Sequence, residues 1–179
     1  MLPIISRRHF LAGTGAILLT PLSPALAALS DARTVAFDNI HTGEKLKIDY
    51  WIGGHYVPEA LSAVNHVLRD FRSGEVHPIA PRLLDLLTML HAHLETDEPF
   101  SVISGYRSPA TNAMLRGDRD HSGVAAKSLH MQGMAIDIRV PGCALTALRD
   151  AALTQRAGGV GYYPASDFVH VDVGRVRTW

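Results

Sequence analysis

Alternation between apolar and polar residues is the first regular feature of the chain, and it predicts strands. Residues 34–52 alternate loosely on either side of the turn sequence HTGEK, as the two arms of a β-hairpin would. Later in the chain, short runs rich in β-branched and aromatic residues predict further strands. These runs cover residues 100–105, 134–140, 159–163 and 168–174, and the turn sequence PASD joins the last two.

Leucine-rich segments with helical spacing lie between these strands. Pro58 and Pro81 suit the first turn of a helix, and apolar residues follow each of them at intervals of three or four. Residues 117–127 are polar and contain glycine, which predicts a mobile surface loop. The order of elements favours one α+β domain with a small antiparallel sheet flanked by helices. The expected helices cover residues 57–71, 81–94, 109–117 and 144–157.

The composition narrows the class of protein. A length of 179 residues and a hydrophobic content of 47% fit one globular domain. The 17 basic and 17 acidic residues balance, so the chain lacks the strongly basic field that nucleic-acid binding requires. Cys143 is the only cysteine, so stability must come from the core or from a bound metal rather than from an internal disulfide.

The first 27 residues have the pattern of an export signal. Arg7 and Arg8 precede a modest apolar run, and Ala25-Leu26-Ala27 fits a small-x-small cleavage site. The serine and paired arginines, followed by Phe10 and a leucine, resemble a twin-arginine signal. An uncleaved membrane anchor is the alternative, but the apolar run is short and is broken by two glycines and a proline.

We therefore expect cleavage near Ala27 and a single mature domain over residues 28–179. Cleavage would remove Arg7 and Arg8 but no acidic residue, which changes the formal net charge from 0 to −2. The expected location is the periplasm or another extracytoplasmic compartment, without stable membrane insertion after cleavage.

Two of the expected strands carry polar residues on one face. In FVHVDVG, His170 and Asp172 point to one side because side chains alternate along a strand, and the valines point to the other. In MAIDIRV, Asp137 points away from the isoleucines on either side of it. An aspartate in the middle of an apolar strand is costly to bury without a partner, so it needs a cation, hydrogen-bond donors or water.

His130 lies shortly before Gly133, where the chain can turn into the strand of Asp137. Two histidine nitrogens and one carboxylate oxygen are a standard ligand set for catalytic zinc, which keeps a fourth position for water. Zinc lowers the pKa of that water and polarises a carbonyl group. On the residue types alone, a structural histidine and a surface aspartate are an equal alternative.

The order and spacing of these residues resemble a known family. Ser128 and His130, then Asp137 after six residues and a late His170, resemble the zinc peptidases of the D-alanyl-D-alanine peptidase and hedgehog fold. The sequences SGYRSPATN and GGVGYYPASDFVHVDVGRVRTW are similar to the murein endopeptidase K branch of that family. The likeness covers residues from about 69 to 179, and it implies the same α+β fold.

The resemblance also implies an activity and roles for single residues. It implies an exported enzyme that cuts peptide cross-links in peptidoglycan with Zn²⁺ bound by His130, Asp137 and His170. Arg107 would bind the substrate carboxylate or stabilise the oxyanion, for which a planar guanidinium is suited. Ser128 would contact the substrate or support the site, and a role in the turn alone is an equal alternative. The oligomeric state stays open.

Two aspartates are candidates for the general base. Many relatives have a glutamate three residues before the last histidine, and this chain has the shorter Asp167 there. Asp172 shares a strand face with His170, and a base must lie within reach of the reacting water. We therefore favour Asp172 slightly. Its alternative role is to hold a histidine ring from behind the site.

Two other functions remain open beside the murein endopeptidase. One is a D,D- or L,D-carboxypeptidase that trims stem peptides. The other is a cell-wall binding module that keeps zinc without catalysis. The two carboxylates that could act as a base favour an enzyme.

Overall fold

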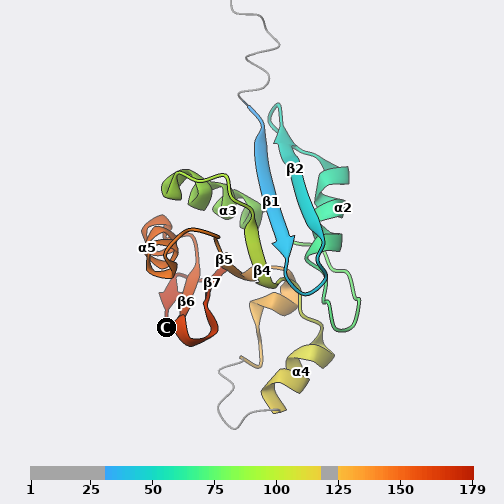
Figure 1. Ribbon diagram of the computed structural model, residues 1–179. Helices are drawn as coiled ribbons and strands as arrows, with labels where there is room; N and C mark the ends of the chain where they lie inside the picture. The colour runs from blue at the N-terminus through green and yellow to red at the C-terminus, as the bar shows by residue number, and fades with distance from the viewer. Residues whose placement is uncertain (1–30, 118–124) are drawn as a thin grey trace, which may run out of the picture.

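An eight-stranded sheet runs through the part of the chain that the computed structural model describes, residues 31–117 and 125–179 (Figure 1). The strand order is β3-β2-β1-β4-β5-β7-β6-β8. The pairs β1–β4 and β6–β8 are parallel, and the other five pairs are antiparallel. The strands are β1 (Arg33–Asn39), β2 (Lys45–Ile52), β3 (His55–Tyr56), β4 (Phe100–Ser104), β5 (Ala135–Arg139), β6 (Gly159–Tyr163), β7 (Phe168–Asp172) and β8 (Arg177–Thr178).

Three of the helices form a layer against this sheet. Helix α3 packs on α5 and on β1, α5 packs on β6 and β7, and α2 packs on β2. Helix α4 follows β4 in the chain and lies apart from this layer, at the bottom of the view in Figure 1. None of the helices in the described residues is long and apolar enough to span a membrane. The helices are α2 (Pro58–Val67), α3 (Pro81–Leu94), α4 (Pro109–Gly117) and α5 (Leu145–Gln155), with 3₁₀ turns η1 (Leu129–Gln132) and η2 (Pro164–Ser166).

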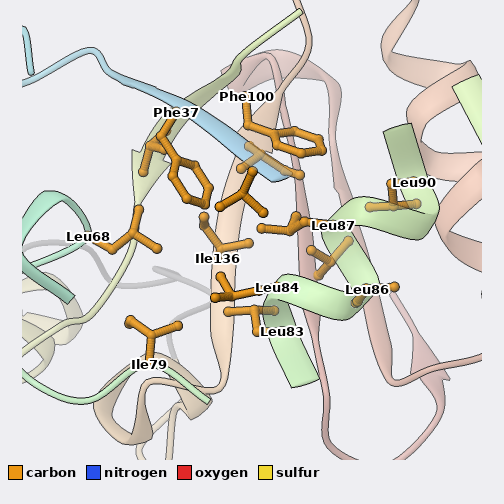
Figure 2. Packing of buried hydrophobic residues seen from close by; sticks show 14 of the residues in the cluster. Phe37, Leu68, Ile79, Leu83, Leu84, Leu86, Leu87, Leu90, Phe100 and Ile136 are labelled. Carbon is orange, nitrogen blue, oxygen red and sulfur yellow. The ribbon is translucent and has the colours of Figure 1, made fainter. Parts of the chain in front are cut away.

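The core lies between the helix layer and one face of the sheet. Leucines of α3 point from the helix toward Phe37, Phe100 and Ile136 on the strands (Figure 2). Leu84 and Leu87 are completely buried there, and burying a side chain of this size stabilises the fold by about 2 kcal/mol. The apolar face of β5 and β7 is thus used for the core, and their polar face is left for a site.

The structure confirms the expected α+β class and a mostly antiparallel sheet flanked by helices. Helix α2 ends at Val67 rather than at residue 71, and the Asn39 side chain donates a hydrogen bond to the Val67 carbonyl at 2.9 Å. Sequence reasoning missed η1 and the two-residue strands β3 and β8. The export signal over residues 1–27 and part of the loop over 117–127 lie outside the described residues.

Gly133 turns the chain from η1 into β5. Its φ of +63° lies in the left-handed region, and an added Cβ would overlap the carbonyl oxygen of Pro78. The Gly133 carbonyl accepts a hydrogen bond from the Ala80 amide at 2.9 Å, so the same turn also holds the start of α3. This close packing sets where His130 stands relative to β5.

Replacing Gly133 with alanine should therefore destabilise the fold by more than the strain of a left-handed backbone alone. We expect Gly133→Ala to lower the free energy of unfolding by about 3 kcal/mol, since the backbone must also move away from Pro78. Gly43 is the matched control, because its φ is +73° and nothing lies within 4 Å of an added Cβ. Gly43→Ala should cost about 1 kcal/mol. Urea unfolding with a chelator measures both, and equal losses would contradict the packing argument.

Candidate active site

The register of the sheet brings the three expected metal ligands together. Asp137 on β5 and His170 on β7 are direct cross-strand partners, and η1 places His130 beside them. The Nδ1 atom of His170 lies 2.8 Å from Asp137 Oδ1 and 3.1 Å from His130 Nε2. His130 Nε2 lies 3.2 Å from Asp137 Oδ1. All three side chains are buried, and Asp137 and His170 lie on the same face of the sheet, as the alternation along their strands predicted.

Hydrogen bonds behind each ring set which nitrogen points into the cluster. His130 Nδ1 lies 2.7 Å from the Gly105 carbonyl oxygen, which only accepts, so this nitrogen carries the hydrogen. His170 Nε2 lies 3.1 Å from Asp172 Oδ2 and donates to it in the same way. Donation from behind thus directs His130 Nε2 and His170 Nδ1 at Asp137 Oδ1. Burial would lower the pKa of His170, but the hydrogen bonds with Asp137 and Asp172 raise it.

With both rings neutral, three lone pairs would meet at this buried point, and a cation between them would relieve their repulsion. The donor set of two imidazole nitrogens and one carboxylate oxygen, all within 4.8 Å of one another, fits a metal ion. Burial alone would raise the pKa of the Asp137 carboxyl, but the His130 and His170 rings lower it well below its ordinary value. Burial lowers the pKa of His130, which keeps that ring neutral and able to bind a metal.

A pocket of about 380 Å³ opens over this cluster. Its wall carries three cationic side chains and three aromatic ones. Ser128, one of the expected substrate contacts, also lines it and is itself buried. The cations are Arg107, Lys127 and Arg177, and the aromatic residues are Tyr163, Phe168 and Trp179.

Arg107 joins the pocket wall to a metal ligand. Its Nη2 donates to Asp137 Oδ2 at 3.3 Å and to Ser104 Oγ at 3.2 Å. Its backbone amide donates to the His130 carbonyl at 3.2 Å, which ties the Arg107 loop to η1. Arg107 Nε has no hydrogen-bond partner among the described residues, although it is buried. The fold therefore places Arg107 in the pocket wall and beside Asp137, as the sequence led us to expect.

Asp70 supports the Arg107 loop from below, a role that sequence reasoning missed. The buried Asp70 carboxylate accepts hydrogen bonds from the amides of Ser108 at 2.9 Å and Arg72 at 3.0 Å. Burial alone would raise the pKa of Asp70, but hydrogen bonds from Thr111 and Ser108 lower it. The sequence signal was weak, because Asp70 lies at the end of an amphipathic segment that resembles continuous helix.

The two candidate bases lie outside the pocket wall. Asp172 shares the face of His170 as expected, but it is fully buried. Its Oδ1 accepts the Gly159 and Gly174 amides, both at 2.9 Å, and its Oδ2 accepts Arg177 Nη2 at 2.7 Å as well as His170 Nε2. Burial opposes the charged form, yet the His170 and Arg177 hydrogen bonds lower the pKa of Asp172.

Asp167 has the opposite surroundings. It is exposed in the turn before β7, and its carboxylate pairs with Arg139 Nη1 at 3.0 Å. Within residues 31–117 and 125–179, Asp137 is the one carboxylate that lines the pocket. The slight preference for Asp172 therefore loses its geometric basis, because sharing a strand face with His170 places it behind the ring instead of in the pocket.

The α+β fold, with two histidines and one aspartate buried under an open pocket, is compatible with a metal-dependent enzyme. The family model described as Peptidoglycan L,D-endopeptidase MepK matches residues 27–179, and the chain belongs to this peptidase family. The resemblance to the murein endopeptidase K branch is thus confirmed.

Curated relatives support the same assignment over nearly the whole chain. The chain is 44% identical over 178 residues to Peptidoglycan L,D-endopeptidase MepK of Escherichia coli (strain K12), which covers 97% of both proteins. The protein of the same name from Shigella flexneri matches equally well. Probable peptidoglycan L,D-endopeptidase MepK of Haemophilus influenzae is 40% identical over 156 residues, which is 87% of this chain and 83% of that protein.

Proposed function

We propose that the protein is a zinc-dependent murein endopeptidase that hydrolyses L,D-type peptide cross-links in peptidoglycan. One observation carries this proposal: two imidazole nitrogens and one carboxylate oxygen, from His130, His170 and Asp137, converge at the floor of an open pocket. Family membership supports the peptide bond as the target, and the names of the relatives support the L,D-type linkage.

His130 Nε2, Asp137 Oδ1 and His170 Nδ1 would hold the zinc ion. Two nitrogen ligands favour zinc over magnesium or calcium, which take oxygen ligands. Bound zinc supplies Lewis-acid chemistry, since it polarises a peptide carbonyl and lowers the pKa of water. The protein contributes the tautomers of both rings, which the Gly105 carbonyl and Asp172 set from behind.

The cationic wall of the pocket suits an acidic peptide. Arg107 and Lys127 line it, and the stem peptides of peptidoglycan carry free carboxylates that would pair with them. The Arg107 guanidinium lines the pocket and would orient a substrate carbonyl or carboxylate. Ser128 would donate its hydroxyl hydrogen to the substrate backbone from the same wall.

We assign different roles to the two aspartates. Asp172 is a positioning residue, since its oxygens are occupied by two amides, Arg177 and His170. Asp167 is the better candidate for the proton acceptor, because it is exposed and Arg139 alone holds it among the described residues. Asp167 directly precedes Phe168, which lines the pocket, so to act it would have to leave Arg139 and turn toward the pocket mouth.

Residues 1–27 would direct export and be removed. The family model begins at residue 27, which supports a boundary between an export segment and the enzyme. Changing Arg7 and Arg8 together to lysine should leave the protein in the cytoplasm, because the twin-arginine pair is recognised by a receptor. Cell fractionation measures this, and unchanged export of the double variant would indicate a general secretory route.

The activity is tested by incubating the zinc-loaded protein with purified muropeptides and identifying the products by mass spectrometry. We expect dimers with L,D-type cross-links to be converted to monomers. A chelator should abolish the reaction, and added zinc should restore it. Cleavage of D,D-type cross-links alone would correct the linkage. Shortened monomers would indicate a carboxypeptidase, and unchanged muropeptides with zinc bound would indicate a binding module.

The roles of Asp172 and Asp167 separate when metal affinity and turnover are measured on the same variants. Asp172→Asn should weaken zinc binding by about 10- to 100-fold, because His170 loses the partner that fixes its tautomer. Asp167→Asn should keep the zinc affinity and lower kcat by about 10²- to 10⁴-fold, as loss of a proton acceptor does.

Competition with a chromophoric chelator measures the zinc affinity in this comparison. Arg139→Gln is the control, because it removes the partner of Asp167 and leaves both carboxylates in place. Normal zinc affinity with a crippled kcat in Asp172→Asn would contradict the assignment and return the general base to Asp172.

A further inference from the structure

The last residues of the chain pack against β6 at the positions of two glycines. Strand β8 pairs in parallel with β6, and Gly159 is the register partner of Arg177. An added Cβ on Gly159 would lie 2.5 Å from Arg177 Nη1, and one on Gly161 would lie 2.7 Å from the Trp179 ring. These two glycines therefore leave the space that Arg177 and Trp179 occupy on the polar face of the sheet.

The Trp179 indole is fixed in place without being buried. Its Nε1 donates to the Tyr163 hydroxyl at 2.6 Å, and the Arg177 guanidinium lies 4.9 Å from its ring centroid. The His170 ring lies on another side, with 5.2 Å between the ring centroids. Trp179 is nevertheless 50% exposed and lines the pocket. An aromatic ring that is held rigidly and left open to a pocket is suited to contact a ligand.

Stacked aromatic rings extend this surface along the pocket. Tyr163 and Phe168 are cross-strand partners on β6 and β7, and their ring centroids are 4.6 Å apart at an interplanar angle of 22°. Both line the pocket with Trp179. The pocket therefore has an aromatic wall, defined by Tyr163, Phe168 and Trp179, on the side of β6.

The strand order places this aromatic wall across the metal ligands from Arg107. Arg107 follows β4, the ligands Asp137 and His170 lie on β5 and β7, and Trp179 lies over β6. Three strand spacings separate β4 from β6, which is roughly 14 Å. An extended peptide of about four residues spans that distance. A substrate held at both ends would place its central peptide bond near the ligands.

We propose that Trp179 is a substrate-contact residue that holds the part of the cross-linked peptide beyond the scissile bond, opposite the part held by Arg107. This inference rests on the proposed function. The indole face would pack on the methylene groups of the cross-linking residue. Contacts on both sides of the cut bond favour a dimeric substrate over a monomer, which makes the wall a determinant of endopeptidase specificity.

Kinetics on cross-linked dimers test the contact. Trp179→Ala should raise KM for dimers roughly tenfold and change kcat less than twofold, and Trp179→Phe should recover most of the loss because it restores a ring. Both variants should keep one zinc ion per chain. Unchanged KM in Trp179→Ala overturns the proposal, and so does loss of zinc in that variant, which would make the residue structural.

Fluorescence gives a second test that does not depend on turnover. The chain has two tryptophans, and Trp51 lies on β2 against Arg33 and Tyr56, outside the pocket. In the zinc-loaded Trp51→Phe protein, rapid mixing with dimers should change the Trp179 emission in a saturable phase before cleavage. Monomers should give a smaller change at the same concentration.

The Trp51→Phe variant also serves as the kinetic control and should keep the KM of the unmodified protein. Absence of a fluorescence change at saturating dimer overturns the substrate contact. If no variant cleaves dimers but the saturable change is present, the proposed hydrolysis fails while the contact at Trp179 stands.

Discussion

The buried cluster of His130, Asp137 and His170 is the constraint on which the rest of the site depends. His130 Nε2, His170 Nδ1 and Asp137 Oδ1 lie within 3.2 Å of one another, and the Gly105 carbonyl and Asp172 hold the two rings from behind. Such a cluster is stable when a cation fills it. The surrounding elements hold it in place: β5 and β7 by their register, and η1 by the tight turn at Gly133.

The pocket above the cluster is asymmetric, and the asymmetry follows from the strand order. Arg107 reaches the ligands from the end of β4, whereas the aromatic wall lies on the β6 side. Asp172 links the histidine–aspartate cluster to the aromatic wall. It accepts hydrogen bonds from His170 and from Arg177, and the Arg177 guanidinium lies over the Trp179 ring. Positioning of the proposed metal ligands and of the aromatic wall thus share one buried carboxylate.

The local periodicity of the sequence predicted the strand faces of the site and the starts of two helices. Alternation along a strand placed His170 and Asp172 on one face and Asp137 away from the core, and proline positions gave the starts of α2 and α3. The sequence left the role of Asp172 open between a general base and a support for a histidine ring, because its partners Gly159 and Arg177 come from other segments. Strand β8 was missed because two residues are too few to show an alternation of apolar and polar positions. Its place also depends on the glycines of β6.

The most direct test of the account is the zinc K-edge X-ray absorption spectrum of the zinc-loaded protein. The account predicts scattering from two imidazole rings at about 2.0–2.1 Å and from oxygen ligands at about 2.0–2.2 Å. It also predicts that His170→Ala no longer retains one zinc ion per chain. A sulfur ligand at about 2.3 Å, which only Cys143 or a methionine could supply, would contradict it, as would an unchanged spectrum in His170→Ala.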